Sequence, residues 1–329
     1  MRILVTGSAG RVGRHLVREL QNLGHEVIGF DAKPLQPEQV DCKYVQGALE
    51  DPEAVACAAE GVQAVIHIGA LMSWVPSDAR RLFAANVAGT FNLLEAVAPL
   101  GLTRFIFASS GEVYPEGNPV YLPVDEHHPT KPTSHYGMTK LLGEQMVWFY
   151  ARKYRMPTVV LRFPHTQDAT ELLDPTSFFS GPRFFLRSKI RQQRMFGNTA
   201  ALAVLEPLDD GTEKLLLSRG SDGTPYRMGI ADTRDVVQGV IKALDSERAL
   251  GETIALGPDE PVRFDQALPR MAELTGLPLV EARLPGNAVN YNTSNFKAKE
   301  LLDFRPRWTF DAMLEEAAAA YRARVSHHE

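Results

Sequence analysis

The stretch Ile3-Leu4-Val5-Thr6-Gly7-Ser8-Ala9-Gly10-Arg11-Val12-Gly13 lies near the start of the chain and decides its fold. An apolar run leads directly into a glycine-rich turn, and the residues after the turn have the apolar spacing of a helix. In such a unit the first glycine permits a tight turn, the second lets the backbone approach a pyrophosphate, and the third lets the helix pack on the strand. The stretch therefore predicts a dinucleotide site at a helix amino terminus.

Short apolar runs and helical segments alternate over the first half of the chain. Such runs suit strands that are buried on both faces, and helices between them imply right-handed crossovers. The fold is therefore predicted to be α/β, with a Rossmann-type, doubly wound parallel sheet. The predicted strands are residues 3–5, 27–30, 44–45, 64–67, 105–108 and 159–161, and the predicted helices are residues 12–23, 52–59, 77–98 and 134–155.

The second half predicts a smaller, mostly carboxyl-terminal lobe that binds substrate. Residues 1–165 are assigned to the dinucleotide-binding Rossmann domain, with 226–256 returning to it, and residues 166–225 and 257–329 to the lobe. The stretch from 164 to 207 is rich in Pro, Gly and aromatic residues and is expected to be irregular. Further predicted elements are strands at 214–218 and 253–255 and helices at 233–244, 264–275 and 310–323.

Composition indicates an ordinary cytoplasmic enzyme. The chain has 329 residues, of which 44% are hydrophobic, and a formal net charge of -5 without a long basic run. This charge argues against nucleic acid and anionic membrane partners and favours a small molecule. Cys42 and Cys57 have no disulfide or metal spacing, which fits a reducing compartment. No leader or membrane span is expected, no metal site is predicted, and His327-His328-Glu329 is interpreted as a frayed tail.

Asp31 ends the second predicted strand, about 20 residues after the glycine turn, where an acidic side chain accepts hydrogen bonds from the adenosine ribose. A carboxylate at this position repels a 2′-phosphate, so the sequence predicts NAD rather than NADP. Lys33 lies two residues further on and could weaken the preference.

Tyr136 and Lys140 are four residues apart in a predicted helix and therefore share one face. A neighbouring ammonium group stabilises a phenolate, so the pKa of Tyr136 is expected to fall from its ordinary value of about 10. A phenol of this kind is an acid and base for alcohol and ketone chemistry.

A series of motifs occurs in one order after the glycine turn. The motifs are Ile66-His67-Ile68-Gly69-Ala70, Asn86-Val87-Ala88-Gly89-Thr90, Ser109-Ser110-Gly111-Glu112-Val113-Tyr114 and Tyr136-x-x-x-Lys140, and Lys297-Ala298-Lys299-Glu300-Leu301-Leu302 follows later. The series resembles the extended short-chain dehydrogenase/reductase family, in particular its NAD-dependent epimerase/dehydratase branch. The resemblance weakens between residues 166 and 227. It implies a homodimeric, NAD-dependent enzyme that acts on a sugar or nucleotide sugar.

The resemblance also implies roles for individual residues. Ser110 would hydrogen-bond the substrate oxygen, Tyr136 would act as acid and base, and Lys140 would lower the Tyr136 pKa and hold the nicotinamide ribose. Glu112 matches a base of related dehydratases and decarboxylases, and a structural role for it stays open. The predicted cofactor contacts are Gly7, Ala9, Gly10, Arg11, Val12, Gly13, Asp31, Leu49, Ile68, Gly69, Ala70, Asn86, Ala108, Tyr136, Lys140, Phe163 and Pro164; the predicted substrate contacts are Ser73, Trp74, Ser110, Glu112, His165 and Arg227.

Departures from the family pattern concern the substrate and one cofactor contact. His165 stands where nucleotide-sugar members usually have Asn, and the phosphate motif from Arg227 to Asp235 fits only with about one residue of slippage. Ala48 replaces an adenine-contacting Asp. Gly111 replaces the acidic or hydroxyl residue that completes a dehydratase pair. His67 is interpreted as a core residue rather than a ligand.

Three functions remain open on the sequence alone. The leading hypothesis is a carbohydrate epimerase or related enzyme that works through a transient ketone. The alternative is a net sugar or uronate dehydrogenase acting on a free carbohydrate, which His165 and the altered phosphate motif favour, whereas the long lobe and the carboxyl-terminal extension favour the epimerase. A third possibility is an NAD(H)-binding sensor, which the intact Ser110, Tyr136 and Lys140 set argues against.

Overall fold

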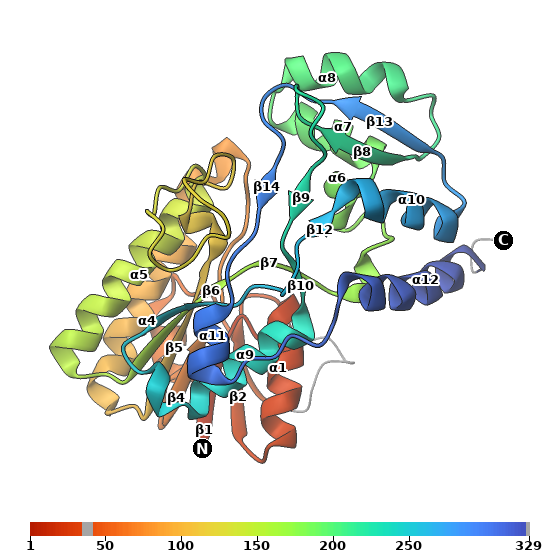
Figure 1. The fold of residues 1–329 in the computed structure, drawn as a ribbon. Helices are drawn as coiled ribbons and strands as arrows, with labels where there is room; N and C mark the ends of the chain where they lie inside the picture. Colours follow the sequence, from red (N-terminus) through yellow and green to blue (C-terminus); the bar gives the residue numbers. More distant parts are fainter. Residues whose placement is uncertain (35–41, 327–329) are drawn as a thin grey trace.

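The computed structural model describes residues 1–34 and 42–326 and is built on a seven-stranded parallel sheet (Figure 1). The strand order is β11-β6-β5-β4-β1-β2-β3, and every neighbouring pair runs parallel. The order reverses between β1 and β4, so the predicted doubly wound α/β fold is confirmed. The strands of this sheet are β1 (Arg2–Thr6), β2 (Glu26–Asp31), β3 (Lys43–Gln46), β4 (Ala64–His67), β5 (Arg104–Ser110), β6 (Thr158–Phe163) and β11 (Thr253–Ala255).

Helices cover both faces of the sheet because its strands are apolar on both sides. In β1, Ile3 and Val5 pack into the core on one face, while Leu4 packs into the core on the other, and all three are fully buried. The first face is covered by α1 (Arg11–Asn22), α9 (Thr233–Asp245) and α11 (Phe296–Leu302), and the second by α2 (Pro52–Ala58), α4 (Gly89–Val97) and α5 (His135–Tyr154) (Figure 1).

The helix predicted over residues 77–98 is interrupted. It begins with a 3₁₀ turn at Pro76–Asp78, continues as α3 (Ala79–Phe83), passes through a π-helical turn at Ala84–Ala88 and resumes as α4. A π turn accommodates one extra residue in a helix and is frequent at functional sites. Here it contains Asn86, whose side chain is buried.

The lobe has its own core around two parallel strands, β8 and β13. Successive leucines of β8 point to opposite sides, since Leu215 and Leu217 join one cluster and Leu216 joins another. The expectation that residues 164–207 are irregular is wrong, because three short helices lie there. The lobe elements are α6 (Ser180–Phe184), α7 (Leu186–Met195), α8 (Thr199–Leu205), β8 (Leu215–Arg219), α10 (Phe264–Thr275), β13 (Leu279–Arg283) and α12 (Phe310–Ser326).

Short strands lie between the large sheet and the lobe (Figure 1). Tyr291, at the end of one of them, donates a hydrogen bond from its hydroxyl to the Gly111 carbonyl (2.9 Å) and so ties the lobe to the end of β5. These strands form one parallel pair, β7 (His165–Gln167) with β10 (Ile230–Asp232), and one three-stranded sheet of β12 (Val262–Arg263), β9 (Arg227–Met228) and β14 (Asn290–Tyr291).

Among the described residues, no helix combines the length and apolarity needed to cross a bilayer. The interpretation of His327, His328 and Glu329 falls outside the described residues.

Candidate active site

The glycine turn has the geometry that its spacing predicts. Gly7 has a φ of +71°, and a Cβ on it would lie 2.6 Å from the Gly69 Cα. A Cβ on Gly13 would lie 2.1 Å from the Gly7 carbonyl oxygen. Gly10 is the N-cap of α1 and supplies no side chain to cap it. The first turn of α1 therefore presents uncapped N–H groups, which fit the pyrophosphate of a dinucleotide.

Asp31 lies beside this turn. Its Oδ2 accepts a hydrogen bond from the Ala9 N–H (3.1 Å) and its Oδ1 from the Lys33 N–H (3.0 Å). The carboxylate is thus held at the end of β2, as expected for a group that binds the adenosine ribose.

The other predicted cofactor residues gather along the same edge of the sheet, where parallel α/β sheets bind their ligands. Asn86 is used structurally: its Oδ1 accepts from the Leu71 N–H (2.7 Å), and its Nδ2 donates to the Leu71 carbonyl (2.9 Å) and to Thr139 Oγ1 (3.0 Å). The edge residues are Ile68, Gly69 and Ala70 after β4, Ala108 and Ser110 in β5, and Phe163 and Pro164 at the end of β6, with Val12 in α1 and the buried Leu49 after β3.

His67 is a buried core residue. It hydrogen-bonds the hydroxyls of Thr6 (2.6 Å) and Thr90 (2.9 Å), and burial lowers its pKa to about 3. The ring is therefore neutral and serves packing.

Ser110 and Tyr136 meet at the carboxyl end of β5. Ser110 lies close enough to the Tyr136 phenol to act against the rise in its pKa, and Ser110 Oγ accepts a hydrogen bond from the Glu112 N–H (3.1 Å). Tyr136 is only 4% exposed and stands in the first turn of α5, which Ser134 caps by accepting from the Gly137 N–H (2.9 Å). The two groups that the sequence assigns to the substrate oxygen therefore lie side by side.

Lys140 lies one helical turn after Tyr136. Its Nζ donates to the Ala108 carbonyl (2.7 Å) and is 5.8 Å from the centre of the Tyr136 ring. The expected fall in the Tyr136 pKa does not occur in the protein alone. Burial raises the Tyr136 pKa above its ordinary value, with a further contribution from Glu112, and burial lowers the Lys140 pKa to about 8. Desolvation outweighs the attraction because the ammonium contacts a carbonyl rather than the phenol oxygen.

Glu112 is buried and fully engaged. Its Oε1 accepts from Trp74 Nε1 (2.9 Å) and its Oε2 from Ser134 Oγ (2.6 Å), while burial raises its pKa. Ser73, the neighbour of Trp74, donates its hydroxyl to Asp78 (2.7 Å). The carboxylate thus joins the loop after β4 to the N-cap of α5. This arrangement gives Glu112 a structural role and does not establish it as a base.

His165 is the centre of a cluster that the sequence only partly reveals. Its Nε2 is 3.4 Å from Glu116 Oε1, and its Nδ1 is 3.4 Å from Arg183 Nη2. Burial lowers the His165 pKa to about 3 and, with Glu112, raises the Glu116 pKa to about 8. Glu116 could have been found from its place just after the Ser109 to Tyr114 motif. Arg183 carries no such signal, because only the fold of the lobe brings it here.

Arg227 is not part of this group. It is exposed on β9 and lines a cavity of about 220 Å³ that none of the other predicted substrate residues lines. The cavity is formed by Thr224, Pro225, Tyr226, Arg227, Arg263, Asp265 and Asn290.

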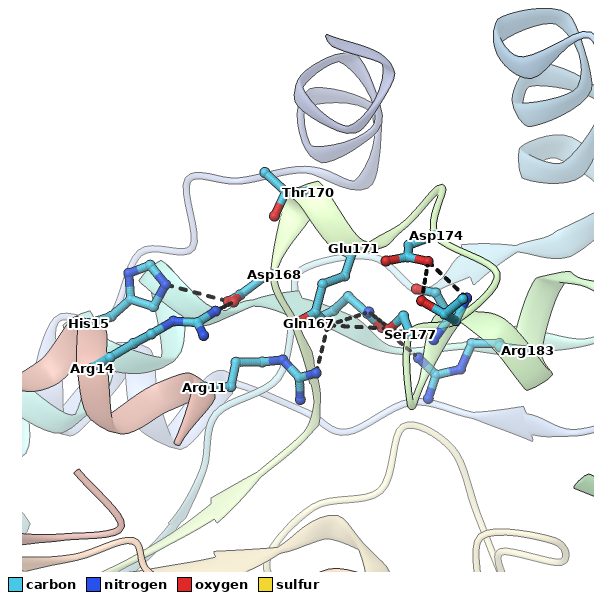
Figure 2. Close-up of polar contacts among 12 residues, drawn as sticks. Arg11, Arg14, His15, Gln167, Asp168, Thr170, Glu171, Asp174, Ser177 and Arg183 are labelled. Carbon is cyan, nitrogen blue, oxygen red and sulfur yellow. Dashed lines mark hydrogen bonds and ion pairs between the residues drawn. The ribbon is translucent and has the colours of Figure 1, made fainter. Parts of the chain in front are cut away.

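A chain of ion pairs joins α1 to the segment after β6 (Figure 2). Arg11 Nη2 contacts Glu171 Oε2 at 2.6 Å, so the Arg11 side chain forms an ion pair with the lobe. Arg14 pairs with Asp168, and His15 Nε2 is 3.6 Å from the same carboxylate. The first turn of the dinucleotide-binding helix is thus fixed to the lobe.

Comparison with known proteins agrees with this geometry. Residues 3–257 match the family model described as the NAD dependent epimerase/dehydratase family. A solved short-chain dehydrogenase/reductase superfamily protein from Agrobacterium tumefaciens with bound NAD is 53% identical, covers 100% of this chain and 99% of its own, and has a TM-score of 0.95.

Two curated relatives differ in the activity their names give. A uronate dehydrogenase from Pseudomonas syringae pv. tomato is 35% identical over 51% of this chain and 62% of its own length, so this chain spans less than two thirds of that relative. A UDP-glucose 4-epimerase from Corynebacterium glutamicum is 25% identical over 98% of this chain and 95% of its own.

Proposed function

Because this chain belongs to the NAD dependent epimerase/dehydratase family, we propose that it oxidises a hydroxyl group of a carbohydrate to a transient ketone, with Ser110, Tyr136 and Lys140 as its catalytic residues. The observation that carries the proposal is the placement of Ser110, at the end of β5, next to the buried Tyr136 phenol, with Lys140 on the same helix face as Tyr136. A sensor that only binds the cofactor has no need of such a buried, paired phenol.

Each residue has a distinct task in this reaction. Ser110 donates a hydrogen bond to the reacting oxygen, and Tyr136 takes up its proton as the carbonyl forms. Lys140 holds positive charge on the Tyr136 face of the site and opposes the cost of a buried phenolate. The bound NAD accepts hydride from the substrate carbon. Returning both hydride and proton to the other face of the ketone completes an epimerisation, which is the leading proposal.

The second candidate is a net dehydrogenase that releases the ketone or lactone and NADH. Two observations favour it: His165 replaces an amide that nucleotide-sugar enzymes use, and Arg227 lines a cavity apart from Ser110 and Tyr136. The similarity to the uronate dehydrogenase of Pseudomonas syringae supports the same candidate. Glu112 is held by two donors, so an elimination step that would use it as base has no support beyond the motif.

One experiment separates these candidates. The purified protein is incubated with NAD and a panel of free sugars, sugar acids and nucleotide sugars, while absorbance in the NADH band and the isomer composition of each sugar are followed. Isomer exchange without net NADH supports the epimerase, and stoichiometric NADH supports the dehydrogenase. Absence of both, in a protein that binds NAD, would refute the proposed function.

NAD preference is predicted to depend on Asp31. Its carboxylate, held by the Ala9 N–H, can accept from both ribose hydroxyls but would repel a 2′-phosphate. Asp31→Ala should narrow the affinity ratio of NAD to NADP by about tenfold, as expected for losing hydrogen bonds to a charged group. Titration of both dinucleotides measures the ratio. Tighter binding of NADP by the unsubstituted protein would overturn this assignment.

A second copy of the chain is the proposed macromolecular partner. Large apolar side chains are exposed next to each other on α4 and α5, among them Phe91 (47% exposed) and Phe149 (51%). A contiguous apolar face of this kind favours a protein interface.

A further inference from the structure

A guanidinium group lies beside the catalytic centre without a carboxylate to pair with it. Arg183, in α6, has no ion pair within residues 1–34 and 42–326. Its Nη1 donates to Gln167 Oε1 at 3.3 Å, and its Nη2 approaches His165 Nδ1 at 3.4 Å. Both contacts are long, and most of the five N–H donors of the side chain have no partner in these contacts. Arg11, which approaches from the opposite side of Gln167, is by contrast paired with Glu171 (Figure 2).

His165 and Glu116, two titratable groups near Arg183, are mainly neutral at physiological pH. Burial lowers the His165 pKa to about 3, so the ring carries one proton. Arginine can only donate, so that proton belongs on Nε2, which lies 3.4 Å from Glu116 Oε1. Burial raises the Glu116 pKa to about 8, so this acid is mainly protonated at neutral pH. It also contacts His165 rather than the guanidinium.

A second cation adds to the imbalance. Lys189 in α7 donates to Gln192 Oε1 (3.1 Å) and, in the part of the chain that the structure describes, makes no ion pair. Burial and Arg183 lower the pKa of Lys189 to about 8. Burial lowers the pKa of Arg183 to about 10, with Glu116 acting in the opposite direction and Arg11 in the same direction. Both groups are mainly charged at neutral pH, and desolvating charges without partners is costly. The side chains of Arg183 and Lys189 therefore form a positively charged region that favours binding of an anion.

The anion would sit close to the reacting carbon. His165, which contacts Arg183, comes two residues after Phe163, and Phe163 pairs with Ser110 across strands β6 and β5. The His165 ring lies 6.0 Å from that of Tyr291, whose hydroxyl bonds the Gly111 carbonyl. Arg183 is thus linked to the end of β5 through His165, Tyr291 and the Gly111 carbonyl, next to Ser110. A charged group bound there belongs to the sugar being oxidised rather than to a distant nucleotide.

From this arrangement we infer that the substrate is a sugar acid, and that Arg183 binds its carboxylate, with His165 orienting the guanidinium. The inference rests on the proposed function for the reaction, and it adds the substrate class. The planar fork of arginine matches a carboxylate with two parallel hydrogen bonds, and such charge-assisted pairs are the strong ones. The neutral His165 and protonated Glu116 leave that fork available.

The test compares matched substrates with matched variants. A hexuronate and its parent hexose, each supplied free and as the UDP derivative, are compared by kcat/KM in the unsubstituted protein, in Arg183→Met and in Arg187→Met. Arg187 is the control because it lies four residues away, is exposed and pairs with Asp209 (3.5 Å). The unsubstituted protein and the control should favour the acid by at least about tenfold, the scale of a hydrogen bond to a charged group. In Arg183→Met the acid should lose this advantage, mainly through KM, and activity on the hexose should change little.

Further measurements separate folding and chemistry from recognition. Thermal unfolding and NAD affinity of Arg183→Met should match those of the unsubstituted protein, and Arg183→Lys should restore part of the preference. Equal turnover of hexose and hexuronate, or equal loss for both in Arg183→Met, overturns the inference while leaving the proposed function intact. A preference for a hexose phosphate over the hexuronate would assign the site to phosphate and also overturns it. If the acid is not turned over but raises the melting temperature only when Arg183 is present, the carboxylate site stands and the proposed function fails.

Discussion

Burial has more influence than neighbouring charge on the ionisable groups of the site. Lys140 lies within one helical turn of Tyr136, yet loss of solvent raises the phenol's pKa and lowers that of the ammonium. His165 and Glu116 shift toward their neutral forms for the same reason. In a site that disfavours charge, few anionic side chains compete with a substrate anion for the cations, and each cation attracts that anion more strongly than it would in water.

Glu116 gives the site a measurable pH dependence. Its pKa is raised from 4.5 to about 8, so the folded protein holds a proton that the unfolded chain releases. The stability contributed by this group is therefore fully present below about pH 4.5 and is lost as the pH rises through about 8. The glutamine side chain of the Glu116→Gln variant cannot ionise. The melting temperature of the variant, relative to that of the unsubstituted protein, should therefore rise between pH 5 and pH 9.

The control for this measurement is Glu60→Gln, on an exposed glutamate. Its difference from the unsubstituted protein should stay constant with pH. A Glu116→Gln difference that is equally constant would show that Glu116 is ionised in the folded protein.

At the residue scale, the sequence predicts best where partners are close in the chain or at the ends of adjacent parallel strands. Tyr136 and Lys140 share a helix face, so their proximity follows from their spacing, and the motifs place Ser110 at the carboxyl end of β5. Arg183 reaches the site only through the packing of the lobe, which no local pattern encodes. The chemical roles of these residues remain predictions.

At the scale of elements, the contact between α1 and the segment after β6 fixes the lobe to the dinucleotide turn (Figure 2). Asp168 is 7% exposed, and Arg14, His15 and Thr233 all act to lower its pKa. Arg324 of α12 donates to the carbonyls of Thr170 and Leu173 (3.1 Å each), so the same segment is also held from the other side.

Asp168→Asn should destabilise the protein by about 1 to 3 kcal/mol, because it leaves Arg14 without its partner at a half-buried position. Because the Asp168 pKa is lowered, the loss should be full at neutral pH and shrink as the pH falls below the ordinary pKa of the carboxyl. Chemical unfolding at several pH values measures it. Asp174→Asn is the control, since within the described residues the Asp174 side chain accepts hydrogen bonds only from Thr176 of its own turn. Equal effects of the two substitutions would show that Asp168 does not bridge α1 and the segment after β6.

Element prediction follows the strength of the apolar pattern. The strands of the large sheet are apolar on both faces, and the pattern predicts them within a few residues. In contrast, α7 is mostly polar, and α6 and α8 have only five and seven residues. The π turn at Ala84–Ala88 inserts one residue without disturbing the apolar spacing on either side, so periodicity cannot reveal it.

At the scale of the molecule, the apolar face of α4 and α5 predicts self-association. Phe149→Asp should convert a dimer to a monomer, because it places a charge at the centre of an apolar contact. Analytical ultracentrifugation measures the change. Phe296→Asp on α11, where the side chain is 72% exposed on the opposite face of the sheet, is the control and should leave the dimer intact. A monomeric unsubstituted protein would refute the proposed interface.

The apolar runs of the sequence predict the large sheet, whereas the way the lobe packs against that sheet depends on tertiary contacts. The doubly wound parallel sheet and the NAD-dependent family are confirmed, whereas the division into domains remains a prediction. In the proposed substrate recognition, the lobe contributes Arg183 from α6.

If Tyr136 takes up the proton of the sugar hydroxyl as it is oxidised, NADH formation in a single turnover must depend on its phenol. The protein is loaded with NAD and mixed with the best substrate of the panel, and absorbance in the NADH band is followed in the unsubstituted protein and in Tyr136→Phe. The variant should form NADH at least about a hundredfold more slowly, the usual scale for losing a general acid or base, with NAD affinity unchanged. An undiminished rate of NADH formation in Tyr136→Phe would show that Tyr136 is not the acid and base of the reaction.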